Sequence, residues 1–231
     1  MSSISLFAQV ILGPAGSGKS TYCHTIKTMA ETLKRNIITV NLDPAAEFLP
    51  YTPDIDIRDL ITLSDVMEEF KLGPNGGLIF CFEFLLQEIG WLETEITENT
   101  IQGDYLLIDC PGQLELYMHL DVFAGVLTSL SSMNMAICTV CLVDSTFCLD
   151  LMKFYGGVLM ALAMMLNLPY GAVTVLSKSD LIDDKGKLQN FLELEPEEGV
   201  GGGEAKNEDY FFQKYGKLYK AIKGLVRFCI F

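Results

Sequence analysis

The stretch that most constrains this 231-residue chain is Gly13-Pro14-Ala15-Gly16-Ser17-Gly18-Lys19-Ser20. It matches the phosphate-binding pattern G-x-x-x-x-G-K-[ST] at every required position. Residues 6–12 before it are mostly apolar, which predicts a buried strand, and residues 21–34 after it have helical spacing. A strand, a glycine-rich loop and a helix in this order direct backbone N–H groups and a helix N-terminus at an anion. The stretch therefore predicts a phosphate site, and a chance glycine-rich turn is the alternative.

Five residues of this stretch, and Thr21 directly after it, are expected to bind a nucleotide. Lys19 would reach the β- and γ-phosphates, and the Ser20 hydroxyl would hold Mg²⁺. The others would surround the phosphates: Gly16, Ser17, Gly18 and Thr21.

Composition excludes some classes of partner. The longest apolar runs, residues 135–143 and 158–166, are about half of the ~20 residues that a membrane span needs, so no membrane contact is expected. The N-terminus has no basic stretch followed by a signal-type apolar segment, which predicts a cytoplasmic or nuclear protein. The net charge of −14 argues against nucleic acid as a direct ligand, because phosphate backbones attract basic surfaces.

Two carboxylates follow predicted strands. Asp43 comes directly after the predicted strand 36–42, where it could hold a Mg²⁺ water or an attacking water. The alternative is that Asp43 only caps a turn before Pro44. Asp109 follows the predicted strand 104–108 and precedes Cys110-Pro111-Gly112, an arrangement with which nucleotide hydrolases sense Mg²⁺ and the γ-phosphate.

Gln113 and Glu115 lie just beyond this glycine, where their side chains could orient a water molecule. A tight turn followed by a capped helix is compatible with the same residues.

A candidate base-binding loop follows the predicted strand 172–176. It reads Ser177-Lys178-Ser179-Asp180 and is similar to the [NT]-K-x-D loop that reads guanine, with Ser in the first place. The carboxylate of such a loop pairs with the N1–H and the 2-amino group of guanine, and the lysine stem lies along the ring. Adenine lacks both donors, so this loop favours a guanine nucleotide.

The alternation of strands and helices predicts an α/β fold with a mainly parallel sheet. Residues 78–91 form a long apolar helical stretch, which suggests a buried helix or a partner interface. Residues 183–209 are rich in Glu and Gly and are expected to be mobile, whereas residues 210–224 regain helical spacing and 226–231 could be a last strand.

The motifs together resemble one family, the GPN-loop GTPases. The resemblance runs from about Gln9 to Leu181 and resumes weakly at Lys217 to Phe228. Besides the phosphate loop and Lys178-x-Asp180, it rests on three stretches: Asn41-Leu42-Asp43-Pro44-Ala45, Gly73-Pro74-Asn75-Gly76-Gly77 and Asp109-Cys110-Pro111-Gly112-Gln113-Leu114-Glu115-Leu116-Tyr117. Taken alone, the second of these reads only as a turn.

The resemblance implies a three-layer phosphate-loop NTPase. Residues 1–231 would form a single GTPase domain that binds GTP or GDP with Mg²⁺, with a helical GPN-loop insertion at about 55–100. Asp43 would serve the magnesium site together with Ser20 and Asp109. Asp109, Gln113 and Glu115 would position metal and water.

The same resemblance implies a dimer, either with a second copy or with GPN-loop GTPase 1. Asn75 would then reach into the partner's active site and help to hold the departing phosphate, and the apolar stretch 78–91 would support the dimer contact. The implied role is assembly and nuclear import of RNA polymerase II, with polymerase subunits as partners and shuttling between cytoplasm and nucleus.

One departure from the family concerns the C-terminus. Family members continue past the segment that corresponds to Val226-Arg227-Phe228 with a further helix and an acidic tail, whereas this chain ends at Phe231. A shortened chain of this kind is expected to leave one wall of the guanine pocket incomplete.

Two other functions stay open on the residues alone. A small-molecule kinase would share the phosphate loop, but its substrate lid usually carries arginines, and this chain has only Arg35, Arg58 and Arg227. A non-catalytic binding partner would keep the dimer surface and lack hydrolysis.

Overall fold

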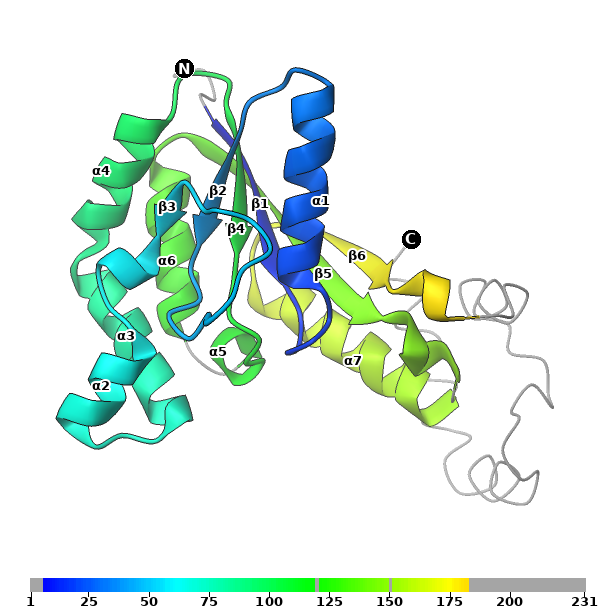
Figure 1. Cartoon of the computed structure of the whole chain (residues 1–231). Coiled ribbons are helices and arrows are strands. Elements are labelled where there is room, and N and C mark those ends of the chain that lie inside the picture. Colours follow the sequence, from blue (N-terminus) through cyan, green and yellow to red (C-terminus); the bar gives the residue numbers. More distant parts are fainter. Residues whose placement is uncertain (1–5, 119–120, 150, 183–231) are drawn as a thin grey trace.

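The computed structural model describes residues 6–118, 121–149 and 151–182, which contain one six-stranded sheet (Figure 1). Its strands are all parallel and lie in the order β3-β2-β4-β1-β5-β6. Their bounds are β1 Leu6–Leu12, β2 Ile37–Asn41, β3 Ile55–Asp56, β4 Tyr105–Asp109, β5 Met135–Asp144 and β6 Gly171–Ser177. Because the strands are parallel, the segments that follow them meet at one end of the sheet.

Helices connect the strands within these described ranges. They are α1 Lys19–Thr32, α2 Leu63–Phe70, α3 Pro74–Gln87, α4 Ile89–Asn99, α5 Glu115–Met118, α6 Asp121–Ser132 and α7 Leu151–Asn167, with 3₁₀ turns η1 Ile57–Asp59, η2 Ser145–Leu149 and η3 Ser179–Leu181. None of these helices combines the length and the apolar character that crossing a membrane requires.

The central strand β1 shows how the sheet is covered on both faces. Val10 and Leu12 are fully buried in a large cluster that includes Phe82 of α3 and Phe123 of α6. Ile11 points to the opposite face, where it packs in a smaller cluster with residues of α1. This alternation confirms the predicted three-layer α/β fold with a parallel sheet.

The predicted helical insertion lies between β3 and β4, but its details differ from the sequence prediction. Gly73-Pro74-Asn75-Gly76-Gly77 is not simply a turn, because α3 already begins at Pro74. Proline is favoured in the first helical turn, where its missing N–H needs no partner. The apolar stretch 78–91 is also not one helix, since α3 ends at Gln87 and α4 begins at Ile89.

Residues 51–58 read as irregular in the sequence, yet Ile55 and Asp56 pair with β2 as the short edge strand β3. Only two residues take part, which is too short for a period-two pattern to be seen. Helix α6 was likewise not predicted, although it contributes four buried side chains to the core. The expectations for residues 183–209, 210–224 and 226–231 lie outside the described residues.

Candidate functional site

The phosphate loop connects β1 to α1 and is built to receive an anion. Gly16 and Gly18 have φ angles of 74° and 93°, which side chains other than glycine adopt only with strain. Gly18 is the N-cap of α1, no side chain caps the helix, and its first turn carries no acidic residue. The first N–H groups of α1 therefore remain available to phosphate oxygens.

Lys19 and Ser17 are buried in this loop. The Lys19 ammonium group donates to the Pro14 carbonyl at 3.2 Å, which curls the side chain back over the loop. Burial lowers the pKa of Lys19, while the charges of Asp109 and Asp43 act in the opposite direction. The Ser17 hydroxyl is buried, and no residue in the described part of the chain forms a hydrogen bond with it. A phosphate group in the loop would give both side chains a strong acceptor.

The sheet order brings Asp109 beside the phosphate loop. In the parallel register, Asp109 at the end of β4 pairs with Ile11 of β1 and with Asn41 of β2. Its Oδ2 atom accepts a hydrogen bond from the Tyr51 hydroxyl at 2.9 Å. Its Oδ1 atom is buried and has no hydrogen-bond partner among the described residues. A buried carboxylate oxygen without a partner is costly, so this atom points to a ligand.

Asp43 is the second carboxylate of the site. The side chain of Asn41 accepts from the backbone N–H of Asp43 at 3.0 Å, and Asp43 Oδ1 accepts from the N–H of Ala45 at 2.9 Å. Asp43 thus caps a turn, as the alternative reading expected, and still lies near Lys19 and Asp109.

Burial raises the pKa of both carboxyl groups. At Asp109 the hydroxyls of Ser20 and Tyr51 and the charge of Lys19 oppose this rise, and the charge of Asp43 adds to it. The described residues contain no group of three or more His, Cys, Asp or Glu side chains that could hold a metal ion. The pair Asp43 and Asp109 suits Mg²⁺, which is commonly held by one or two carboxylates together with phosphate oxygens and water. Ser20, Asp43 and Asp109 therefore fit as the protein's part of a magnesium site.

Gly112 joins the loop after β4 to the phosphate loop. A Cβ atom placed on Gly112 would lie 2.7 Å from the Ala15 Cα atom and 2.9 Å from its backbone nitrogen. Only glycine permits this approach, which explains the residue type in the Asp109-x-x-Gly112 pattern.

The predicted base-binding loop is tied to the phosphate loop. The Ser177 hydroxyl donates to the Ser17 carbonyl at 2.7 Å, across 160 residues of sequence. The backbone of Lys178 is left-handed, with φ 56°, and its ammonium group pairs with Asp144 at 2.7 Å. Although burial acts in the opposite direction, hydrogen bonds from Lys178 and Thr146 lower the pKa of Asp144. The ion pair with Asp144 therefore holds the Lys178 side chain in place.

Asp180 lies in η3 and is exposed. Its carboxylate makes no hydrogen bond or ion pair with other described residues, and it is free to accept from a base. Ser179 is exposed beside it.

Three further predicted site residues form no hydrogen bond or ion pair with this cluster in the described ranges. Asn75 is exposed in the first turn of α3, and Figure 1 shows the turn between α2 and α3 projecting at the end of the sheet where the strands finish. Gln113 lies before α5, and Glu115 is exposed at its first residue. Among the described residues, no side-chain hydrogen bond or ion pair links any of the three to Lys19 or Asp109.

The sequence reading missed several polar residues that organise the site. Arg58 forms an ion pair with Asp56 and donates to the Ala46 carbonyl at 2.8 Å, which fastens the loop after Asp43. Asn41 donates to Asp56 at 2.9 Å. The sequence feature that could have identified Asn41 is an asparagine at the buried end of an apolar strand.

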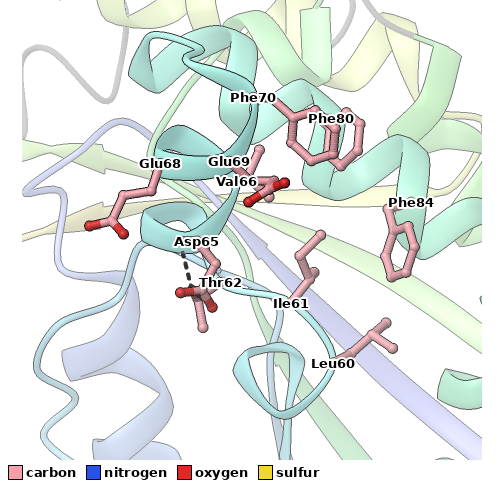
Figure 2. Close-up of a pocket in the computed structure, with 10 residues that line it drawn as sticks. All are labelled: Leu60, Ile61, Thr62, Asp65, Val66, Glu68, Glu69, Phe70, Phe80 and Phe84. Atoms are coloured by element: carbon pink, nitrogen blue, oxygen red, sulfur yellow. Dashed lines mark hydrogen bonds between the residues drawn. The ribbon is translucent and has the colours of Figure 1, made fainter.

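The insertion carries a groove of about 480 Å³ between α2, α3 and the segment before α2 (Figure 2). Its aromatic part comes from Phe70, Phe80 and Phe84, and the Phe70 and Phe80 rings lie 4.5 Å apart. Leu78, Phe82 and Leu85 of the same apolar stretch are buried in this chain's own core. Most of the apolar stretch 78–91 therefore packs within this chain's own core.

Known proteins resemble this chain over most of its length. Residues 11–228 match the family described as "Conserved hypothetical ATP binding protein". GPN-loop GTPase 3 of Dictyostelium discoideum is 41% identical over 221 residues, covering 94% of this chain and 75% of that protein. GPN-loop GTPase 3 of Yarrowia lipolytica is 43% identical over 225 residues, covering 95% of this chain and 82% of that protein.

Among solved structures, the crystal structure of a GTPase in apo form from Pyrococcus abyssi has a TM-score of 0.71 to this chain. It is 26% identical, with 84% of this chain and 76% of that chain covered. The fold, the phosphate loop and these relatives agree, and the chain belongs to the GPN-loop GTPase family.

Proposed function

We propose that this chain is a dimeric, magnesium-dependent GTP switch that acts in the assembly and nuclear import of RNA polymerase II. The observation that best supports nucleotide binding is the hydrogen bond that the Ser177 hydroxyl donates to the Ser17 carbonyl. It joins a base-binding loop to a phosphate-binding loop, and a nucleoside triphosphate would have to contact both.

The reaction is attack of water on the γ-phosphate, which yields GDP and inorganic phosphate. Lys19 and the free N–H groups at the start of α1 would stabilise the charge that develops on the phosphate oxygens. Bound Mg²⁺ would neutralise further charge, with Ser20, Asp43 and Asp109 as its protein partners. Gln113 and Glu115 are proposed to orient the attacking water.

Asn75 is proposed to act across a dimer. Its side chain is exposed and makes no hydrogen bond with other described residues of its own chain. Asn75 belongs to the first turn of α3, and the turn between α2 and α3 projects at the end of the sheet where the strands finish (Figure 1). A second copy, or GPN-loop GTPase 1, would receive this asparagine next to its γ-phosphate. The exposed Phe70 beside the groove would add apolar area to the contact.

Asn75→Ala is expected to slow GTP hydrolysis by about 100-fold, because one donor to the transition state is lost, and to leave GTP affinity nearly unchanged. Single-turnover hydrolysis and fluorescent-nucleotide titration measure the two effects. Asn99→Ala is the matched control, since Asn99 is also an exposed asparagine but lies at the far end of α4. Unchanged turnover in Asn75→Ala would contradict the proposed role.

A mixing experiment tests whether Asn75 acts on the active site of the partner subunit. Asn75→Ala subunits keep the phosphate loop, and Lys19→Ala subunits keep the asparagine. Mixing the two inactive variants is expected to restore hydrolysis in half of the sites of each mixed dimer. Absence of rescue, with mixed dimers demonstrated by sizing, would place Asn75 in its own subunit's site.

The polymerase role is proposed from family resemblance. Depletion of the protein from cells is expected to leave RNA polymerase II subunits in the cytoplasm. Re-expressed wild type should restore their nuclear import, whereas Asn75→Ala should not. Normal polymerase import after depletion would contradict this role and leave the nucleotide chemistry intact.

A further inference from the structure

Tyr51 lies near Asp43 and Asp109, the two carboxylates of the candidate magnesium site, and the sequence motifs give it no role. It lies in the loop between β2 and β3, and its side chain is only 9% exposed. The ring packs in the smaller core cluster with Ile11, Cys23 and Leu107. The phenol hydroxyl then reaches Asp109 Oδ2 at 2.9 Å, a contact between two buried groups 58 residues apart. Neither the phosphate loop nor the base-binding loop requires such a tyrosine.

We propose that Tyr51 is a positioning residue of the magnesium site, one that fixes the Asp109 carboxylate through Oδ2 and leaves Oδ1 for the metal or its water. This inference rests on the proposed function. The observation behind it is a difference between the two oxygens: Oδ2 accepts a hydrogen bond from a buried donor, whereas Oδ1 accepts none from any described residue, although the Ser20 hydroxyl lies near the carboxylate. A phenol is protonated at neutral pH and can only be a donor toward a carboxylate.

The same hydroxyl also links Asp109 to the loop that carries Asp43. Asp43 and Tyr51 lie on one loop, which hydrogen bonds fasten at several other points, two of them close to Asp43 in sequence. The Arg58 guanidinium donates to the Ala46 carbonyl at 2.8 Å, and the Leu63 N–H donates to the Pro44 carbonyl at 3.1 Å. Two contacts among the described residues tie this loop to β4: the Leu42 N–H donates to the Asp109 carbonyl at 2.8 Å, and the Tyr51 hydroxyl donates to the Asp109 carboxylate. The Tyr51 hydroxyl therefore helps to hold the Asp43 loop in register with Asp109.

Groups that orient a metal-binding carboxylate change metal affinity without contacting the metal. Tyr51→Phe keeps the ring and its packing and removes only the donor. It is expected to raise the Mg²⁺ concentration that half-maximally slows release of fluorescent GDP by about 10- to 100-fold. Release in EDTA should stay at the wild-type rate, because the phosphate loop is untouched.

Tyr105→Phe is the matched control. Tyr105 is a half-buried tyrosine at the opposite end of β4, and its hydroxyl interacts with Gln9. Its Mg²⁺ titration is expected to match the wild type. If Tyr51→Phe accelerates release equally in EDTA and in Mg²⁺, the hydroxyl supports the fold in general and the inference is wrong.

A double-mutant cycle shows whether Tyr51 acts through Asp109. In an Asp109→Asn background, Tyr51→Phe should add little to the loss of Mg²⁺ response, since coupled groups are not additive. A full additional loss would overturn the inference. If wild-type GDP release does not respond to Mg²⁺ at all, the proposed magnesium site fails; if it responds and Tyr51→Phe titrates as the wild type, only the role of Tyr51 fails.

Discussion

Lys19→Ala is expected to lower the rate of GTP hydrolysis by about 100- to 1,000-fold, the loss seen when a preorganised charge-stabilising donor is removed. The Lys19 side chain is 8% exposed, and its ammonium group lies over the loop that would receive the phosphates. Water cannot replace it easily in a buried site. GTP affinity should fall as well, because the lysine is proposed to contact the phosphates before and during the reaction.

The measurement is single-turnover hydrolysis at saturating enzyme, with affinity obtained by titration of fluorescent GTP analogue. Lys34→Ala, just beyond the other end of α1, is the matched control and should behave as the wild type, because Lys34 is exposed. Hydrolysis by Lys19→Ala within a few-fold of the wild type would contradict the assignment of the phosphate site.

Gly112→Ala is expected to reduce hydrolysis by about 100-fold, the effect of displacing a reacting group by about 1 Å. The added methyl group would lie 2.7 Å from the backbone of Ala15, so either the loop after β4 or the phosphate loop has to move. Backbone on both sides of the contact leaves no flexible side chain to yield. The geometry between Asp109 and the phosphate loop is lost as a result.

Gly156→Ala serves as the control for this substitution. Gly156 lies in α7, and nothing is found within 4 Å of a Cβ atom built there. Alanine in that helix should be neutral or stabilising by about 1 kcal/mol. Both variants are compared by thermal unfolding and by hydrolysis rate; wild-type hydrolysis in Gly112→Ala would show that the close approach is not needed.

The sequence predicted the parts of the fold that repeat a local pattern. The predicted strands 6–12 and 104–108 agree with β1 and β4 within one residue at each end, and the apolar run 135–143 forms β5. The insertion was harder, because glycines at 73, 76 and 77 indicate a turn by local propensity. In the structure, Gly77 packs against α2, where a Cβ atom would lie 2.7 Å from Leu63, so tertiary packing favours the helix.

The motif residues of the site could also be predicted from the sequence. The contacts that hold them in position could not. The phosphate loop, Asp43 and Asp109 form the expected cluster. The Tyr51 contact to Asp109 and the Ser177 contact to Ser17 join residues 58 and 160 positions apart. Such pairings depend on strand order, which no local pattern in a single sequence specifies. The order β2-β4-β1-β5-β6 creates both of them.

The choice between guanine and adenine is the most direct test of this account. The matched family is described as ATP-binding, whereas the relatives are GPN-loop GTPases, and the Asp180 carboxylate, which is unpaired among the described residues, is proposed to accept from guanine. The measurement is titration of the full chain with fluorescent GDP and fluorescent ADP in Mg²⁺. A clear preference for GDP is predicted. Tighter binding of ADP, or binding of neither nucleotide by chain shown to be folded, would contradict the account.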